Sequence, residues 1–312
     1  MTRPIEVPIS AQTATHTDPR LLDLEQATRT LAPVEEFMER ALDSLDLPSN
    51  LLEATRYALL GGGKRLRPLL VLYSGLASGH PIDRAVPAAA AVEMVHAFSL
   101  VHDDLPALDN DDTRRGKPTV HKACGEAMAI LVGDGLMSMA FQILTLHYPP
   151  PIAGRLCREL AAGSTAMIAG QVLDTLGGFA ADTTPRRRLE LVHRNKTGAL
   201  IRASCRMGPI AAGLPDSDPR LAALTAYGDA VGLMFQIVDD LVDVLQTSDH
   251  AGKRTGKDSD AGKLTYPGVL GLEESAKEVE RLRLLARTCL EPCGTDAAPL
   301  AQLSDYLAVR TR

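Results

Sequence analysis

Residues 88–112 read AAAAVEMVHAFSLVHDDLPALDNDD, an apolar run that ends in a group of aspartates. Apolar residues recur here at spacings of three and four, which is the period of a helix with a buried face. The same period appears in residues 21–42, 126–144, 155–176 and 227–245. The polar–apolar alternation of strands is almost absent, and Ala, Leu and Met are good helix formers. The chain is therefore predicted to be all-α, with one large helical bundle.

Glycine and proline divide this pattern into about ten predicted helices with short connections. Residues 1–20 are rich in Pro and Thr and are aperiodic, so we expect a flexible N-terminal arm. The helical pattern resumes after every break without a clear linker, so residues 21–312 are predicted to form one domain. The breaks are expected at Pro48 and at residues 61–63, 79–81, 149–151, 177–178, 215–219 and 248–262.

Composition disfavours several classes of protein. The net charge of −6 argues against a nucleic-acid partner, and 4% aromatic residues without Trp argue against a base-stacking surface. Five cysteines without a CxxC pair support neither a disulfide framework nor a zinc ribbon. The N-terminus lacks the apolar run of a signal peptide, and no stretch approaches about 18 uncharged apolar residues. We therefore expect a cytoplasmic protein without a membrane span.

An acidic cluster follows the first apolar run. A solvated loop could have this composition, but this cluster ends an apolar helix and is therefore expected at the edge of the core. Pro106 disfavours the α conformation at Leu105, so the helix is expected to distort there. The distortion would bring together Asp103 and Asp109, which an ideal helix would place on different faces. The cluster comprises Asp103, Asp104, Asp109, Asp111 and Asp112.

A second acidic cluster, Asp239, Asp240 and Asp243, lies within the apolar sequence FQIVDDLVDV. Asp239 and Asp243 share one helix face, and Gln236 lies one turn earlier on the same side. Two clusters of carboxylates without His or Cys favour a hard cation such as Mg²⁺, whose remaining positions are filled by water and substrate phosphate oxygens. Together they predict a site that binds a polyphosphate through metal ions.

Basic residues lie near both clusters in sequence. Lys64, Arg65 and Arg67 follow three glycines at a predicted helix start, where exposed backbone amides favour an anion. The segment does not match the ATP-type P-loop pattern. Arg114 and Arg115 directly follow the first acidic cluster. A phosphate ester is therefore the expected ligand.

Three further groups of residues extend this interpretation. His96 shares a helix face with Ser99 and Asp103, although a single histidine there is more often part of the core. Lys196 and Thr197 lie in RNKTGAL. A polar segment that a flexible loop would explain equally well contains Lys253, Lys257 and Lys263.

In combination, these motifs resemble the trans-prenyl diphosphate synthases of the bacterial farnesyl/geranylgeranyl diphosphate synthase type. The matching segments occur in the family's order from about residue 35 to the C-terminus. They are GGGKRLRP, DDLPALD with NDDTRRGKPT, GDGL, GQVLD, NKTGALI, FQIVDDLVD and GKLTYP. The resemblance implies the isoprenoid synthase fold, a helical bundle around a deep apolar cavity, and a homodimer. It implies the Mg²⁺-dependent condensation of isopentenyl diphosphate with an allylic diphosphate, with three Mg²⁺ ions.

Roles for individual residues follow from the same resemblance. The implied metal ligands are Asp103, Asp109 and Asp239, with Asp104 and Asp243 supporting them. The residues expected to hold the allylic diphosphate are Arg114, Lys196 and Lys263. Those expected to hold isopentenyl diphosphate are Lys64, Arg67, His96 and Arg115. Thr197 and Gln236 are expected to stabilise the carbocation as dipoles beside Lys196, and no general-base side chain is required.

The motifs are compatible with two product lengths, fifteen and twenty carbons. Phe98 lies five residues before Asp103, about 7.5 Å deeper along an ideal helix. In the family, an aromatic ring at this position resembles the farnesyl type, which stops at fifteen carbons. The small neighbouring Ser99, and Met137 and Met139 on a helix expected to face it, leave room for twenty carbons. We expect farnesyl diphosphate, with geranylgeranyl diphosphate as the alternative.

Two other classes of protein share part of this pattern. A terpene cyclase would ionise an allylic diphosphate with metals, but it would not need GGGKRLR and His96, since it binds no second diphosphate. A non-catalytic subunit that modulates another prenyl synthase typically lacks aspartates from one cluster. This chain retains both clusters.

Overall fold

A computed structural model describes residues 24–249 and 264–310, and helices form nearly all of that part of the chain. The helices meet the all-α prediction. In chain order the elements are α1 (Leu24–Asp43), α2 (Ser49–Leu59), α3 (Leu66–Ala77), η1 (Ile82–Ala85), α4 (Val86–Asp103), β1 (Thr113–Arg114), β2 (Lys117–Pro118), α5 (Val120–Cys124), α6 (Glu126–His147), α7 (Pro150–Thr175), α8 (Pro185–His193), η2 (Arg194–Gly198), α9 (Ala199–Ala211), α10 (Pro219–Asp249), α12 (Tyr266–Leu270), α13 (Leu272–Cys289), η3 (Glu291–Ala297) and α14 (Ala298–Val309).

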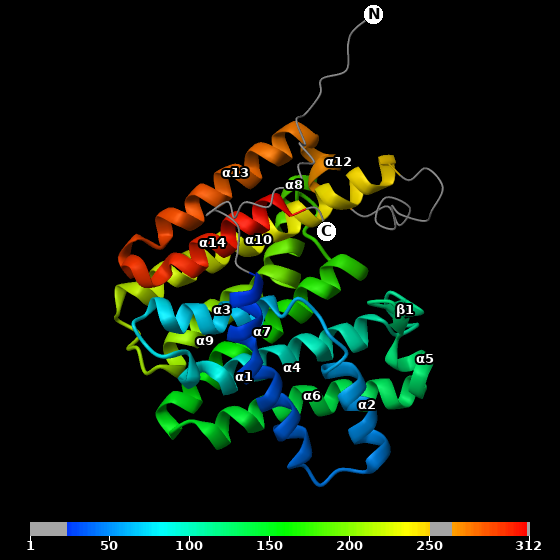
Figure 1. Ribbon diagram of the computed structural model, residues 1–312. Helices are drawn as coiled ribbons and strands as arrows, with labels where there is room; N and C mark the ends of the chain where they lie inside the picture. Colours follow the sequence, from blue (N-terminus) through cyan, green and yellow to red (C-terminus); the bar gives the residue numbers. More distant parts are fainter. Residues whose placement is uncertain (1–23, 250–263, 311–312) are drawn as a thin grey trace, which may run out of the picture.

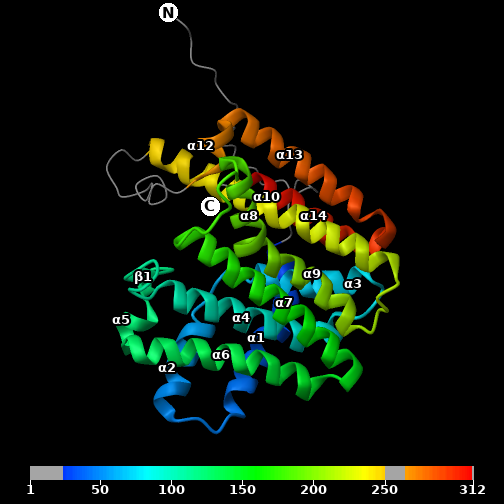
Figure 2. The ribbon, with the colours of Figure 1, turned by 180° about the vertical axis from the view of Figure 1, so that it is seen from behind.

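The helices gather around two hydrophobic cores. The first core joins α1, α2, α4 and α6 through side chains such as Met38, Met94 and Leu136. The second joins α3, α10, α13 and α14 through side chains such as Tyr227 and Leu303. Figures 1 and 2, which view the molecule from opposite sides, show the two groups stacked with α7 and α9 between them. Helix α3 also contributes Val71 and Leu72 to the first core. The helices that carry the two acidic clusters, α4 and α10, therefore belong to different layers.

Most predicted breaks separate helices in the structure. Pro48 precedes α2, the glycines at 61–63 precede α3, and α7 begins at Pro150, where a proline needs no helical N–H partner. Residues 177–178 and 215–219 likewise lie at helix ends or between helices. The last predicted break, at residues 248–262, falls largely outside the described residues. The predicted single domain for residues 21–312 stays a prediction.

A two-stranded hairpin, β1 with β2, is an element that the periodicity did not predict. Thr113 pairs with Pro118 and Arg114 with Lys117, so that only Arg115 and Gly116 form the turn. Both turn residues have positive φ values, 53° and 76°, as a tight two-residue hairpin turn requires. Strands of two residues are too short for an alternating pattern to be visible in the sequence.

Three helices are long and apolar enough to cross a membrane by length and composition: Ile82–Asp103, Glu126–His147 and Pro219–Val244. The expectation that no segment approaches a membrane span is therefore wrong on these two measures. A helix with an apolar surface all round belongs either in a large core or in a membrane. In the structure, 67%, 44% and 61% of the respective apolar windows are buried against other helices.

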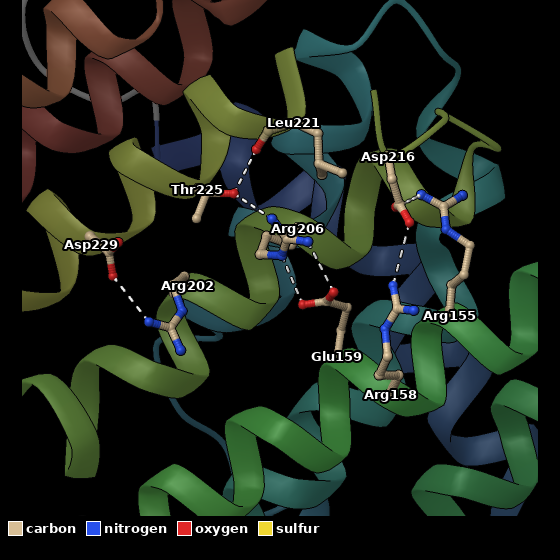
Figure 3. Close-up of polar contacts among 9 residues, drawn as sticks. All are labelled: Arg155, Arg158, Glu159, Arg202, Arg206, Asp216, Leu221, Thr225 and Asp229. Atoms are coloured by element: carbon tan, nitrogen blue, oxygen red, sulfur yellow. Dashed lines mark hydrogen bonds and ion pairs between the residues drawn. The ribbon is translucent and has the colours of Figure 1, made fainter. Parts of the chain in front are cut away.

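Polar side chains connect α7, α9 and α10 (Figure 3). Arg206 of α9 donates to both carboxylate oxygens of Glu159 in α7, at 2.8 and 3.0 Å, and to the hydroxyl of Thr225 in α10, at 2.6 Å. Arg155 of α7 also pairs with Asp216, just before α10, at 2.6 Å. A two-pronged arginine–carboxylate contact fixes orientation as well as distance. These contacts connect α9 to α7 and α10, two helices that line the cavity described next.

Candidate active site

A cavity of about 1660 Å³ lies between the two layers, lined by residues from α1, α3, α4, α7, α10 and α14. Residues from distant parts of the sequence meet in it. The sequence-predicted residues that line the cavity are Lys64, Arg67, His96, Phe98, Ser99, Asp103, Arg115, Lys196, Thr197, Gln236 and Asp239. Asp109 and Arg114 lie beside the cavity without lining it, and Lys263 lies outside the described residues.

The first acidic cluster forms where α4 ends. The chain turns back after Asp103, and the backbone N–H of Asp109 donates to the carbonyl oxygen of Asp103 at 2.9 Å. The distortion expected at Pro106 thus brings the two residues together. Burial, together with the charge of Asp109 and against the opposing charge of Lys196, raises the pKa of the Asp103 carboxyl to about 6. A cation at this position would relieve that penalty.

Asp104 occupies a different environment from Asp103. It is buried, and its carboxylate accepts two-pronged hydrogen bonds from Arg114 at 2.6 to 2.9 Å. Asp104 therefore anchors the β1–β2 hairpin to the end of α4. The Arg114 guanidinium, predicted to hold a diphosphate, is placed by this pair at the side of the first acidic cluster.

In the second acidic cluster, Asp239 faces the cavity and Asp240 is buried in the protein. Asp239 lines the cavity, with its side chain 42% exposed, and accepts a hydrogen bond from Arg310 at 2.5 Å. Burial raises the pKa of Asp239, and the charge of Arg310 opposes that rise. Asp240 is buried and accepts from the backbone N–H of Tyr266 at 2.9 Å and from Gln236 at 3.2 Å. Asp240 thus supports the helix beside the cavity.

A π-helical turn, η2, presents Lys196 and Thr197 to the cavity. The Lys196 ammonium donates to Asp174 of α7 at 2.7 Å, and the Thr197 hydroxyl donates to Gln236 Oε1 at 2.9 Å. Single π-helical turns within helices often occur at functional sites. These two bonds fix both side chains relative to α7 and α10.

Two residues of the GQVLD motif, to which the sequence analysis gave no role, support this turn. Asp174 pairs with Lys196, as described above. A Cβ atom at Gly170 would lie 2.1 Å from the backbone nitrogen of Lys196, so only glycine permits α7 to approach η2 this closely. The motif is therefore explained by its contact with the turn.

Four basic groups line the same cavity. The Arg115 guanidinium donates to the carbonyl oxygen of Gly62 in the glycine loop. Lys64, Arg67 and His96 line the cavity nearby. Burial, and then the charges of Arg67 and Arg115, hold the pKa of His96 well below its usual range. The imidazole is therefore neutral at neutral pH and offers one N–H donor.

Two buried side-chain nitrogens in this basic group lack a hydrogen-bond partner within the described residues: Arg67 Nε and His96 Nδ1. Buried polar atoms are nearly always paired in folded proteins. An orphaned guanidinium nitrogen beside a histidine and two more cations fits an anionic ligand with several oxygens. Lys64, Arg67, His96 and Arg115 are called the basic cradle below.

Arg65, counted with the basic residues in the sequence, points into the protein framework instead. Its side chain is 5% exposed and donates to Glu93 at 2.7 Å, to Glu35 at 2.6 Å and to the carbonyl oxygen of Leu59 at 2.8 Å. Its backbone has a φ of 48°, the left-handed conformation. Arg65 therefore fixes the junction between the loop that carries Lys64 and the first turn of α3, which carries Arg67.

Sequence reasoning missed Arg310, which closes the second acidic cluster from the far end of the chain. Its guanidinium lies 3.9 Å from the ring centroid of Phe235 and donates to the Phe235 carbonyl oxygen at 3.1 Å as well as to Asp239. The only signal in the sequence is an arginine that follows the apolar pattern of α14. Nothing in that pattern identifies an acid 71 residues away as its partner.

The chain-length residues lie on the cavity side of α4. Phe98 and Ser99 both line the cavity, and the Ser99 hydroxyl donates to the His96 carbonyl oxygen at 2.9 Å. Met137 and Met139 belong to α6, which packs on α4, but among the described residues it is Met167 of α7 that lines the cavity. The expectation that the two α6 methionines shape this space is not met, because they pack into the core.

The carboxylate oxygens of the two acidic clusters fit a hard cation, provided that other ligands complete its coordination shell. Asp103 and Asp239 supply carboxylate oxygens on either side of the cavity, with Asp109 beside Asp103. Within residues 24–249 and 264–310, no three His, Cys, Asp or Glu side chains form a ready-made metal site. Mg²⁺ typically takes one or two carboxylates and completes its octahedron with water and phosphate oxygens.

Comparisons with known proteins agree with this architecture. The polyprenyl synthetase family model matches residues 48–291. The large subunit 1 of a heterodimeric geranylgeranyl pyrophosphate synthase from Arabidopsis thaliana is 43% identical over 287 residues, covering 88% of this chain and 77% of that protein. A dimethylallyltranstransferase from Fischerella ambigua is 43% identical over 289 residues, covering 90% of this chain and 83% of that protein.

A solved structure shares the fold. The FPP/GFPP synthase from Zymomonas mobilis superposes with a TM-score of 0.79 at 33% identity, covering 92% of this chain and 98% of that chain. On the family match, the sequence identity and this likeness of fold, the chain belongs to the polyprenyl synthetase family, the trans-prenyltransferases with the all-α isoprenoid synthase fold.

Proposed function

We propose that this protein condenses isopentenyl diphosphate with an allylic diphosphate, head to tail, to give farnesyl diphosphate in a Mg²⁺-dependent reaction. One observation carries the proposal. A single cavity is lined both by carboxylates from two helices, Asp103 and Asp239, and by the basic cradle, in which Arg67 Nε and His96 Nδ1 lack a partner among the described residues. An enzyme that binds one diphosphate through metals and a second one directly needs this arrangement.

The allylic diphosphate would bind at the acidic clusters. Asp103, Asp109 and Asp239 would hold Mg²⁺ ions, which neutralise the diphosphate as a leaving group and reverse the sign of the acidic site. Lys196, fixed by Asp174, would supply a further positive charge from the η2 side, with Arg114 and Lys263 as the other basic residues. These charges lower the cost of separating a diphosphate from an allylic carbocation.

Isopentenyl diphosphate would bind in the basic cradle. Arg67 and His96 each have a nitrogen that lacks a partner among the described residues, and Lys64 and Arg115 lie beside them. Direct binding of the second diphosphate by side chains leaves its carbon chain free to point toward the allylic carbon. Holding the two reacting carbons in attack geometry is itself a large part of the rate enhancement.

The chemistry needs no side-chain base. The bond between the allylic C1 and its diphosphate oxygen breaks, and the C3–C4 double bond of isopentenyl diphosphate supplies the electrons for the new C1–C4 bond. A proton is then lost to the departed diphosphate, which restores a double bond. Thr197 uses its hydroxyl proton to bond Gln236, so its oxygen offers lone pairs that stabilise a nearby cation.

Product length would be limited by Phe98. This side chain lines the cavity five residues before Asp103, about 7.5 Å along an ideal helix. A ring at that depth supports a fifteen-carbon product. The alternative, geranylgeranyl diphosphate, is favoured by the names of several relatives, including the Arabidopsis thaliana protein. Phe98→Ala is expected to lengthen the product, and an unchanged product spectrum would refute this ruler.

Assembly and location complete the proposal. The exposed surface of α6 carries large apolar side chains, Ile130, Leu131 and Leu146, and a second copy of the chain that covered them would form a homodimer. We propose that this dimer works in the cytoplasm.

The decisive experiment incubates the purified protein with Mg²⁺, isopentenyl diphosphate and, in separate reactions, dimethylallyl, geranyl or farnesyl diphosphate. The products are dephosphorylated and separated by reversed-phase chromatography. We expect farnesol as the main alcohol from the two shorter primers. A cyclised hydrocarbon without isopentenyl diphosphate would indicate a terpene cyclase. The absence of any condensation product would refute catalysis and favour a modulatory subunit.

A further inference from the structure

His102 lies one helical turn after Phe98 on α4, and the two rings are in direct contact. Their centroids are 4.9 Å apart and their planes meet at 74°, an edge-to-face arrangement. Both side chains line the cavity. Phe98 thus meets the cavity on one side and the imidazole ring on the other.

The position of the imidazole is fixed by a neighbouring helix. His102 Nε2 lies 3.1 Å from the carbonyl oxygen of Ile130 on α6. A carbonyl oxygen only accepts, so Nε2 carries the proton and donates. The ring therefore connects α4 to α6 at the level of the first acidic cluster.

The GDGL motif supplies the space for this ring. A Cβ atom at Gly133 would lie 2.1 Å from His102 Nε2, 2.4 Å from its Cδ2 and 2.9 Å from its Cε1. Any other residue at 133 would push the imidazole out of its niche and away from the Ile130 carbonyl. Nothing else in the proposed mechanism needs a glycine at this position.

We propose that His102 is a positioning residue for product length, which holds the Phe98 ring across the cavity from a niche created by Gly133. The proposal rests on the proposed function, since it assigns a structural cause to the place where chain growth stops. An edge-to-face contact with a ring that is itself hydrogen-bonded limits the rotamers open to Phe98. Without that contact, the Phe98 ring has room to turn aside and admit another five-carbon unit.

The test separates the two contacts of His102 by substitution. His102→Phe keeps the ring but loses the donor, His102→Gln keeps a donor but loses the ring, and His102→Ala loses both. Gly133→Ala leaves His102 intact and fills its niche. Each full-length variant is incubated with Mg²⁺, geranyl diphosphate and isopentenyl diphosphate, and the lengths of its products are compared with those of the unaltered protein.

We expect His102→Ala and Gly133→Ala to raise the ratio of longer to shorter product by about two- to twelve-fold, the range that corresponds to losing one aromatic contact. His102→Phe and His102→Gln should give smaller rises. His102→Ala in a Phe98→Ala background should change the ratio no further, because the effect passes through Phe98. A merely destabilised helix would not show this non-additivity.

His147 offers a matched control. It contacts Phe37 in the same geometry, 4.9 Å between centroids and 72° between planes, outside the residues that line the cavity. His147→Ala should leave product length unchanged. The inference is overturned if the His102→Ala and Gly133→Ala variants are active but give the same ratio of longer to shorter product as the unaltered protein. It is also overturned if His147→Ala changes this ratio as much as His102→Ala does. If the unaltered protein forms no condensation product, the proposed function fails first and this inference falls with it.

Discussion

Replacing Glu93 by Ala tests whether the buried arginine network sets the basic cradle. Arg65 and Glu93 are 5% and 3% exposed, whereas Glu35, the other carboxylate on Arg65, is 40% exposed. Removing one partner of a buried ion pair costs about 3–5 kcal/mol because the remaining charge stays buried. Since Glu35 still pairs with Arg65 in the variant, we expect the lower end, about 3 kcal/mol.

At about 2–4 °C per kcal/mol, that loss lowers the melting temperature by about 6–12 °C. Glu35→Ala is the matched control, because it removes a carboxylate from the same guanidinium where water can replace it. It should cost about 1 kcal/mol or less, or about 2–4 °C. Thermal unfolding followed by circular dichroism measures both changes.

The same substitution should also affect one substrate more than the other. Arg65 lies between Lys64, at the end of the loop, and Arg67, in the first turn of α3, so Glu93→Ala is expected to raise the KM for isopentenyl diphosphate more than the KM for the allylic diphosphate. The reasoning is refuted if Glu35→Ala destabilises the protein as much as Glu93→Ala does, or if both KM values rise together.

Three further predictions follow from contacts in the site. Gly170→Ala should lower kcat about 100-fold by displacing the backbone of Lys196. Gly154→Ala, on the same helix, should leave kcat unchanged because an added Cβ there meets nothing within 4 Å. Steady-state kinetics of both variants test this difference. Arg310→Gln should lower the dissociation constant for Mg²⁺ about three- to tenfold by freeing Asp239. Calorimetric titration with Mg²⁺ in the absence of substrate measures this constant, and an unchanged value would contradict the prediction. His96→Gln should make the melting temperature less sensitive to acid: the folded-state pKa of His96 is lowered, so the unfolded chain binds the extra proton as pH falls through about 6.5 and stability drops. Equal melting-temperature losses between pH 7 and pH 5 in both proteins would contradict the effect.

The sequence was sufficient to predict features with a local cause. The proline at 150 and the run of glycines at 61–63 mark helix starts, because they restrict or release the backbone of their own residues. The turn after Asp103 had a local cause too, in Pro106. The meeting of two acidic clusters followed from the chemistry of carboxylates, since two buried groups of like charge need a shared counter-charge.

Features with a distant cause were beyond prediction. The bond between Arg310 and Asp239 depends on how α14 lies across α10, which no periodicity encodes. The niche at Gly133 depends on the approach of α4 to α6. From the sequence alone, a glycine at this position indicates only a less stable helix. The membrane-span expectation failed for a related reason. Helices of a large bundle can match a span in length and composition, so packing rather than composition separates the two.

The β1–β2 turn has a consequence for how the two substrates affect each other. Arg114, the last residue of β1, and Arg115, the first residue of the turn, are adjacent in the chain, yet Arg114 pairs with Asp104 at the acidic cluster and Arg115 bonds the glycine loop of the basic cradle. A diphosphate that fixes one of these arginines also restricts the backbone of the other, so the second substrate has less conformational freedom to remove. We therefore expect synergy: each diphosphate should tighten the binding of the other by the same factor, as thermodynamic reciprocity demands.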